Sequence, residues 1–108
     1  MDDQEFDKRA DKSLQALYRR LAAASDELDF DVDLNGGALS IEFSDPPAKF
    51  VVSPNAPVQQ IWVSAQSKSY KLDWDSVENA FVLQATGQTL TELIQGAITK
   101  QLGEEVTL

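Results

Sequence analysis

The segment VQQIWVSAQ, residues 58–66, decides how this chain of 108 residues folds. Its apolar and polar residues alternate with period two, which predicts a strand with Ile61, Val63 and Ala65 on one face. Trp62 lies on the other face, with Gln60 and Ser64. A large indole among polar residues is typical of a contact residue that binds a partner. The alternative is that a neighbouring side chain or the end of the chain covers it.

The surrounding sequence predicts two amphipathic helices. Apolar residues at three- and four-residue spacing indicate a helix from about Asp3 to Ala24. Near the other end, Thr89 and Glu92 fit a capping box, in which a hydroxyl and a carboxylate bond to the first free amides of a helix. Apolar residues follow with helical spacing, so a second helix is expected there.

Between these helices the pattern predicts strands joined by short turns. Apolar residues alternate with Asp over residues 28–34, and Asn35-Gly36 supplies the positive-φ residues of a tight hairpin into residues 39–43. Further strands are expected near residues 49–53, 59–66, 70–75 and 80–85. We therefore predict a single α+β domain over residues 1–108. It is a two-layer sandwich with two helices on one face of an antiparallel sheet of about five to six strands, and the other face is open.

Composition limits the classes of function. Eighteen Asp and Glu against nine Lys and Arg give a formal net charge of -9 at pH 7, which repels nucleic acid and anionic membranes and favours cations and basic protein surfaces. The apolar runs are too short for a membrane span, and the acidic start fits no signal or transit peptide, so we expect a cytoplasmic protein. Without Cys or His, the chain has no thiolate or imidazole ligand and no cysteine nucleophile.

One short motif suggests a calcium loop. Asp31, Asp33, Asn35 and Gly36, with Glu42 six residues after the glycine, satisfy the EF-hand pattern. An EF-hand needs a helix on each side of its loop, whereas the residues before Asp31 alternate with period two. Two consecutive prolines also follow Glu42 closely and would break a helix there. The pattern therefore favours a hairpin over a calcium loop.

Four segments together resemble a known family. FVVS at residues 50–53, PVQQIWVS at 57–64 and YKLDW at 70–74 resemble the central signature of the frataxin family, and TGQTLTEL at 86–93 resembles the opening of its C-terminal helix. The resemblance, closest to the bacterial CyaY-like members, implies iron handling and regulation of iron–sulfur cluster assembly. It implies binding to the cysteine desulfurase and the scaffold protein, with Gln60, Trp62 and Ser64 as the sheet contact. It also implies that the chain end, with Val106 and Leu108, lies between the two helices.

Acidic residues crowd the first third of the chain. Ten of the eighteen lie within residues 1–33, and Asp7 shares a helix face with Asp3 and with Asp11 because each pair is four residues apart. The resemblance implies that the first helix and first strand are neighbours, so that these acids form one acidic ridge. We predict that the ridge binds metal through Asp3, Asp7, Asp11, Asp26, Glu27, Asp29, Asp31 and Asp33. The alternative is a solvated edge that prevents aggregation of the strand.

Such a ridge is expected to bind iron weakly. Carboxylate oxygens are hard ligands for ferrous and ferric iron and for other divalent cations, but an open surface gives little selectivity. Many bacterial frataxins carry histidine in the first helix or after the tryptophan, and this chain has none. Any imidazole contribution to iron binding is therefore absent, which leaves protein docking as the better supported role.

Nothing in the pattern predicts an enzyme, because the chain has no His, no Cys and no Gly-rich phosphate loop. We predict a non-enzymatic, iron-binding regulator or adaptor of iron–sulfur cluster assembly that docks on the desulfurase and the scaffold. The alternative is an iron chaperone or store that acts through the ridge alone, and a third reading is an acidic interaction domain unrelated to metal. A monomer is expected, with oligomerisation on iron binding left open.

Overall fold

The computed structural model describes all 108 residues and contains two long helices and seven strands. In chain order the elements are α1 (Asp3–Ala24), β1 (Phe30–Asn35), β2 (Ala38–Ser44), β3 (Pro47–Asn55), a short 3-10 helix (Ala56–Val58), β4 (Gln60–Ala65), β5 (Lys68–Asp75), β6 (Ala80–Leu83), β7 (Gln88–Thr89) and α2 (Leu90–Leu102). Neither helix has the length and apolar composition needed to cross a bilayer.

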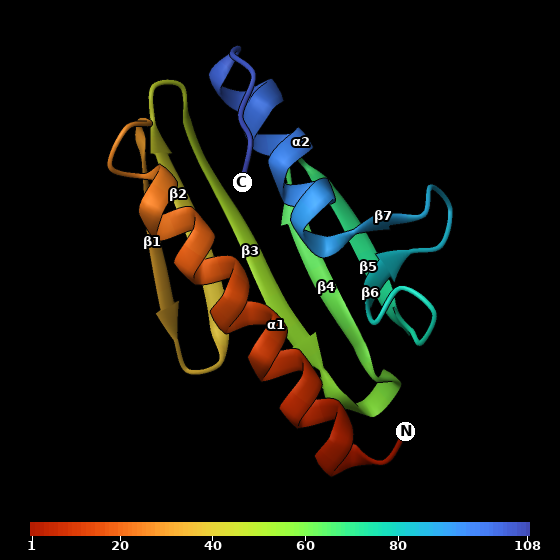
Figure 1. Ribbon diagram of the computed structural model, residues 1–108. Coiled ribbons are helices and arrows are strands. Elements are labelled where there is room, and N and C mark those ends of the chain that lie inside the picture. Colours follow the sequence, from red (N-terminus) through yellow and green to blue (C-terminus); the bar gives the residue numbers. More distant parts are fainter.

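The strands form one antiparallel sheet in which each strand pairs with the next along the chain, from β1 to β7. Both helices lie on the same face of this sheet (Figure 1). The predicted two-layer α+β sandwich is therefore confirmed. The sheet has seven strands where about five to six were expected. The additional strand is the two-residue β7, which is too short to produce a periodic pattern in the sequence.

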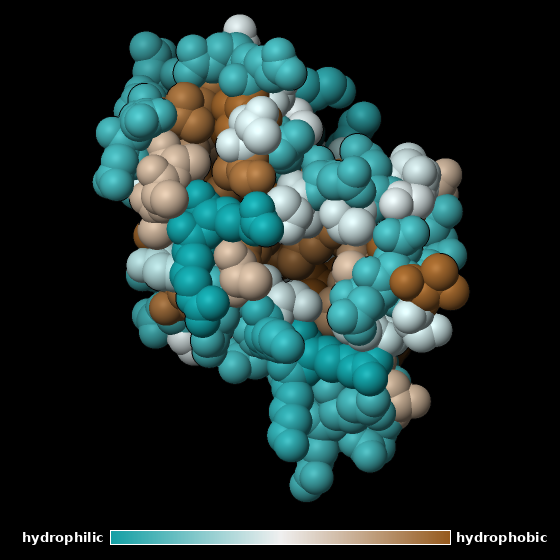
Figure 2. Space-filling model, viewed as in Figure 1, coloured by the Kyte–Doolittle hydropathy of each residue, from teal (hydrophilic) through white to brown (hydrophobic).

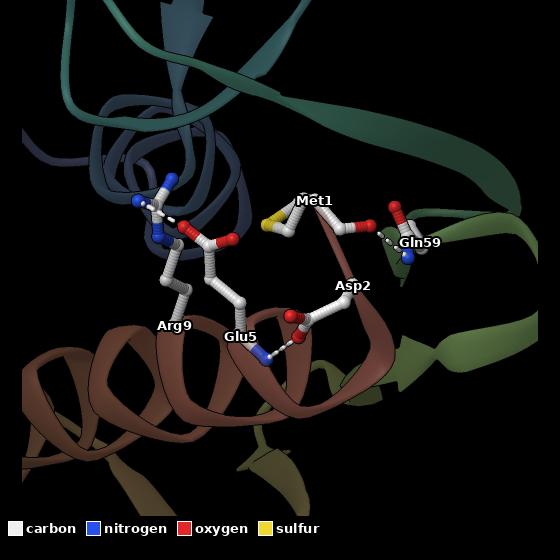
Figure 3. A network of polar contacts seen from close by, with 5 residues as sticks. All are labelled: Met1, Asp2, Glu5, Arg9 and Gln59. Carbon is white, nitrogen blue, oxygen red and sulfur yellow. Dashed lines mark hydrogen bonds and ion pairs between the residues drawn. The ribbon is translucent and has the colours of Figure 1, made fainter.

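Helix α1 begins and ends where its apolar spacing predicts, at Asp3 and Ala24. Asp2 caps it, because its Oδ1 accepts a hydrogen bond of 2.7 Å from the backbone N–H of Glu5. Figure 3 shows this cap beside two further contacts. Gln59 donates to the carbonyl of Met1 at 2.7 Å, and Arg9 forms an ion pair with Glu5. The start of α1 is thus fixed to the segment that leads into β4.

The turn between β1 and β2 differs from the predicted one by one position. Asn35 pairs with Ala38 as the last rung of the ladder, so the two turn residues are Gly36 and Gly37, with φ of 63° and 81°. A two-residue hairpin of this kind needs positive φ at both central positions, and two glycines adopt it without steric cost. Since Asp31 lies in β1 and the matching Glu42 in β2, this motif is a hairpin rather than a calcium loop.

One hydrophobic core fills the space between the helices and the sheet. The chain end contributes to it, because Val106 is buried and Leu108 packs against the same cluster. The backbone N–H of Val106 donates to Thr99 Oγ1 at 3.1 Å, and that of Leu108 donates to Gln95 Oε1 at 2.9 Å. Figure 1 shows the last residues returning beside α2 toward α1. The expectation that this segment lies between the helices is confirmed.

Candidate functional site

Strand β4 presents its two faces as the alternation predicts. Ile61 and Val63 are buried in the core, whereas Trp62 lies on the open face of the sheet with 38% of its surface exposed. A tryptophan in a hydrophobic core is far less exposed than this, so the indole is not part of the core. The chain end does not cover the indole, since Val106 and Leu108 pack into the core on the helix side of the sheet. A neighbouring side chain covers part of it, because Lys71 of β5 lies over the ring.

Two hydrogen bonds and one cation hold the indole in a fixed orientation. Trp62 Nε1 donates to Gln60 Oε1 at 3.0 Å, and Gln60 Nε2 donates to Asp73 Oδ1 at 3.0 Å. The Lys71 ammonium lies 5.0 Å from the centre of the indole ring, within the range of a cation–π contact. Asp73 and Lys71 are the direct cross-strand neighbours of Gln60 and Trp62 on β5. An aromatic side chain held in this way loses little conformational entropy when a partner binds.

Around the indole the open face is hollowed. The hollow has a volume of about 410 Å³ and is formed by β3, β4 and β5. We call this region the tryptophan face and define it by Val51, Ser53, Gln60, Trp62, Ser64, Ser69 and Lys71. The sequence prediction named three of these residues, all on β4. The other four come from neighbouring strands, and only the pairing register places them beside Trp62.

The acids of α1 lie in the helical layer. Asp7 and Asp11 are exposed and border a hollow of about 180 Å³ beside Gly37 of the β1–β2 turn. Asp11 Oδ2 accepts a hydrogen bond of 3.0 Å from Gln15, one turn further along the helix. Asp3 lies at the start of the helix, where its Oδ1 is 3.4 Å from the amide nitrogen of Gln59. These carboxylates form a row along one edge of α1.

The acids of β1 point away from that layer. Asp31 lies opposite Glu42 of β2, and with Asp33 they border a hollow of about 280 Å³ on the open face. The like charges are partly balanced, because Lys49 Nζ lies 3.9 Å from Glu42 Oε1. The alternating apolar residues Val32 and Leu34 pack against the core instead. The predicted acidic ridge therefore consists of two rows, one on each side of the edge strand.

Asp26, Glu27 and Asp29 lie in the exposed segment between α1 and β1, at the other end of α1 from Asp3, Asp7 and Asp11. No three carboxylates anywhere in the chain come close enough together to hold one metal ion. The ridge therefore has no preformed coordination shell. Cations attracted to such a surface would be held by its summed charge, with strong dependence on salt.

Comparison with known proteins gives a consistent result. The model of the frataxin-like domain family matches residues 1–104. The solved structure of a frataxin from Psychromonas ingrahamii, described as a model for stability within the CyaY protein family, superposes with a TM-score of 0.84. The two sequences are 25% identical, and the match covers 98% of this chain and 96% of that one. The likeness therefore extends over the whole fold, including both helices and the sheet.

Proposed function

The chain belongs to the frataxin family, which is linked to iron–sulfur cluster biogenesis, and on this basis we propose that it is an iron-binding adaptor of the assembly machinery. In this proposal it docks on the cysteine desulfurase and the scaffold protein without catalysing a reaction itself. The single observation that carries the proposal is the exposed and fixed indole of Trp62 at the centre of the open face.

The tryptophan face is suited to a flat protein contact. It offers one large aromatic anchor with small hydroxyl-bearing residues around it, so a partner side chain can approach the sheet closely. Interface anchors are commonly aromatic and surrounded by residues of small individual contribution. We assign this face, with Gln60, Trp62 and Ser64 at its centre, to the scaffold protein.

The acidic ridge is suited to a basic surface, and we assign it to the desulfurase and to weakly bound iron. None of its eight carboxylates is engaged in an ion pair, because the two salt bridges in the chain use Glu5 and Glu42. The carboxylates are therefore free to pair with Arg and Lys of a partner, or to attract ferrous and other divalent cations. Both processes use the same ridge carboxylates, so iron and the partner are expected to compete for them.

The proposal is tested by mapping each ligand onto the chain with backbone NMR. Labelled protein is titrated separately with ferrous iron under anaerobic conditions, with the purified scaffold and with the purified desulfurase. Scaffold is expected to shift resonances of the tryptophan face, while iron and desulfurase shift those of the ridge. Trp62→Ala should weaken scaffold binding, and Val77→Ala, which alters an equally apolar exposed residue far from the face, should not. Scaffold binding of equal strength by both variants would refute the assignment.

The second candidate, an iron chaperone or store that acts through the ridge alone, is favoured by the absence of ion pairs among the ridge carboxylates. It needs no contact at Trp62. A chain that binds iron at the ridge but neither protein partner would fit this function. A chain whose ridge resonances respond to neither iron nor desulfurase would leave only a general acidic interaction domain.

A further inference from the structure

Helix α1 carries opposite charges on its two edges. Asp7 and Asp11 lie on the edge toward the β1–β2 turn, whereas Arg9 and Lys12 lie on the edge toward the β5–β6 hairpin. The helix holds five of the nine basic residues of the chain, namely Lys8, Arg9, Lys12, Arg19 and Arg20. Although the protein as a whole is acidic, this local concentration of positive charge attracts anions.

Part of this basic surface borders a hollow of about 300 Å³ between α1 and the β5–β6 hairpin. Arg9, Lys12 and Ser13 contribute from the helix, and Trp74 and Asn79 contribute from the hairpin. Figure 2 shows the helix-covered side of the molecule, whose surface is mainly hydrophilic. A volume of this size is at the lower end of the range for small-molecule sites, so it suits a compact ligand.

The two cations at the hollow differ in their partners. Arg9 is engaged twice, by the ion pair of 2.6 Å between its Nη2 and Glu5 Oε1 and by its position with Cζ 4.3 Å from the centre of the Trp74 ring. Lys12 has no carboxylate within ion-pair distance. The Ser13 hydroxyl donates to the carbonyl of Arg9 at 2.7 Å and is thereby fixed at the rim. Lys12 at the rim is therefore unpaired, and Arg9 can bind an anion in place of its ion pair with Glu5.

A buried donor without a partner lies at the same place. Trp74 Nε1 has almost no exposed surface and no hydrogen-bond acceptor, and it is the only buried side-chain polar atom in the chain in this condition. Native structures leave few such groups, and each calls for an explanation such as a ligand or an ordered water. Trp74 borders the hollow, so this N–H is an unpartnered donor beside the two cations, and an anion reaches it only if the side chains around it move.

We propose that the hollow binds a small oxyanion with at least two negative charges, held by Lys12 and Arg9 with the indole N–H of Trp74 as a third donor. Carboxylate and phosphate oxygens both match this set, because Arg pairs with either through two parallel hydrogen bonds and Lys through a point charge. The site lies on the helix side of the sheet, opposite the tryptophan face, and does not depend on the proposed function.

The two indole resonances provide a direct test. Trp62 Nε1 already donates to Gln60 on the other side of the sheet, so its signal is an internal control, and the spectrum of Trp62→Phe identifies which signal is which. Labelled wild-type protein is titrated with succinate, with inorganic phosphate and with sodium chloride at matched ionic strength. Succinate or phosphate is expected to move the Trp74 indole proton downfield with saturation, while chloride moves it little. The tighter of the two anions identifies the natural class.

Two lysines one turn apart give matched variants. Lys12→Gln removes a cation that borders the hollow, whereas Lys8→Gln removes the same charge from the same helix outside it. We expect Lys12→Gln to weaken anion binding about three- to fivefold, as the loss of one partly exposed ion pair does, and Lys8→Gln to change it less than about twofold. Equal effects of the two variants, or a Trp74 shift that follows ionic strength without saturation, would overturn the proposal.

Discussion

Ile61 and Trp62 are neighbours in β4 and yet serve different purposes, because consecutive residues of a strand point to opposite faces. Ile61 has no exposed surface and lies in the core under the helices. Trp62 projects to the open face and is oriented by Gln60 and Lys71. A pair of adjacent substitutions can therefore separate stability from docking within a single strand.

For Trp62→Ala we expect a loss of unfolding free energy well under the ~3–5 kcal/mol typical of a buried tryptophan, with docking to the scaffold weakened by ~2 kcal/mol or more. Ile61→Ala should do the reverse, costing roughly 2–5 kcal/mol of stability through a core cavity while leaving the contact surface intact. Urea denaturation and calorimetric titration with the scaffold measure the two quantities. If Trp62→Ala unfolds the domain, the placement of the indole on the open face is wrong.

At the scale of elements, the capping box of α2 is visible in the sequence, and its contribution to stability can be estimated. Thr89 Oγ1 accepts from the backbone N–H of Glu92 at 3.3 Å, and Glu92 Oε1 accepts from the backbone N–H of Thr89 at 2.9 Å. We expect Thr89→Ala to lower stability by ~1 kcal/mol, because it leaves one of the first amides of the helix without a partner. Thr107→Ala, at an exposed position outside any element, is the control and should change the denaturation midpoint little.

The chain end is an element without regular secondary structure that nevertheless supports the fold. Val106 fills the core beside α2, and Arg20 of α1 donates to the carbonyl of Leu108 at 3.2 Å. Burying one such aliphatic side chain is worth ~1.5–3 kcal/mol, so truncation after Gly103 should lower stability by a few kcal/mol. Its effect on metal binding should be small, since the ridge lies elsewhere. An unchanged denaturation midpoint after truncation would mean that the end is frayed in solution.

Periodicity predicts an element well when the element is long and one of its faces is buried. The 22 residues of α1 and the alternating residues of β4 are of this kind. Two features of the fold could not be predicted from periodicity. The two residues of β7 are too few for a period, and the hairpin turn depends on a pairing register that shifts the positive-φ positions from Asn35-Gly36 to Gly36-Gly37.

The same reasoning explains what could be predicted of the site. Alternation within β4 places Trp62 and its two polar companions on one face, but the contributions of Ser53 and Lys71 follow only from the pairing of three strands. For the ridge, composition identifies the acids. The side of β1 on which each row lies follows from the packing of α1 over the sheet, which is a long-range property.

At the scale of the whole molecule, charge is distributed in three regions. Two acidic rows lie on either side of β1, and a basic strip follows the opposite edge of α1. A net charge of -9 opposes compaction, and the like charges within each row repel one another along this edge of the sheet. Cations that collect at this edge relieve the repulsion, so folding stability and metal binding are linked.

We therefore expect the melting temperature to rise with sodium chloride and to rise further with ferrous iron, calcium or magnesium at the same ionic strength. A ligand that binds only the native state stabilises it by RT ln(1 + [L]/Kd), about 2.7 kcal/mol at a hundredfold excess over Kd. Calorimetric scans across a metal titration measure the increase. A melting temperature that changes with no salt or metal would show that repulsion among the acidic residues does not destabilise the fold.

The strongest test of this linkage replaces Asp29, Asp31 and Asp33 together by Asn. The triple variant should be more stable than wild type without metal, because like charges across β1 and β2 repel by a few tenths to ~1 kcal/mol per pair. It should also gain less stability from metal, because the same change removes the ligands.

A second triple variant supplies the control by changing the same net charge at distant exposed positions, namely Glu78→Gln, Glu104→Gln and Glu105→Gln. If both variants respond alike to metal, net charge alone governs the response and the location of the ridge has no effect. If only the Asn variant loses the metal response while gaining stability, the repulsion and the cation binding arise from the same carboxylates at the edge of the sheet.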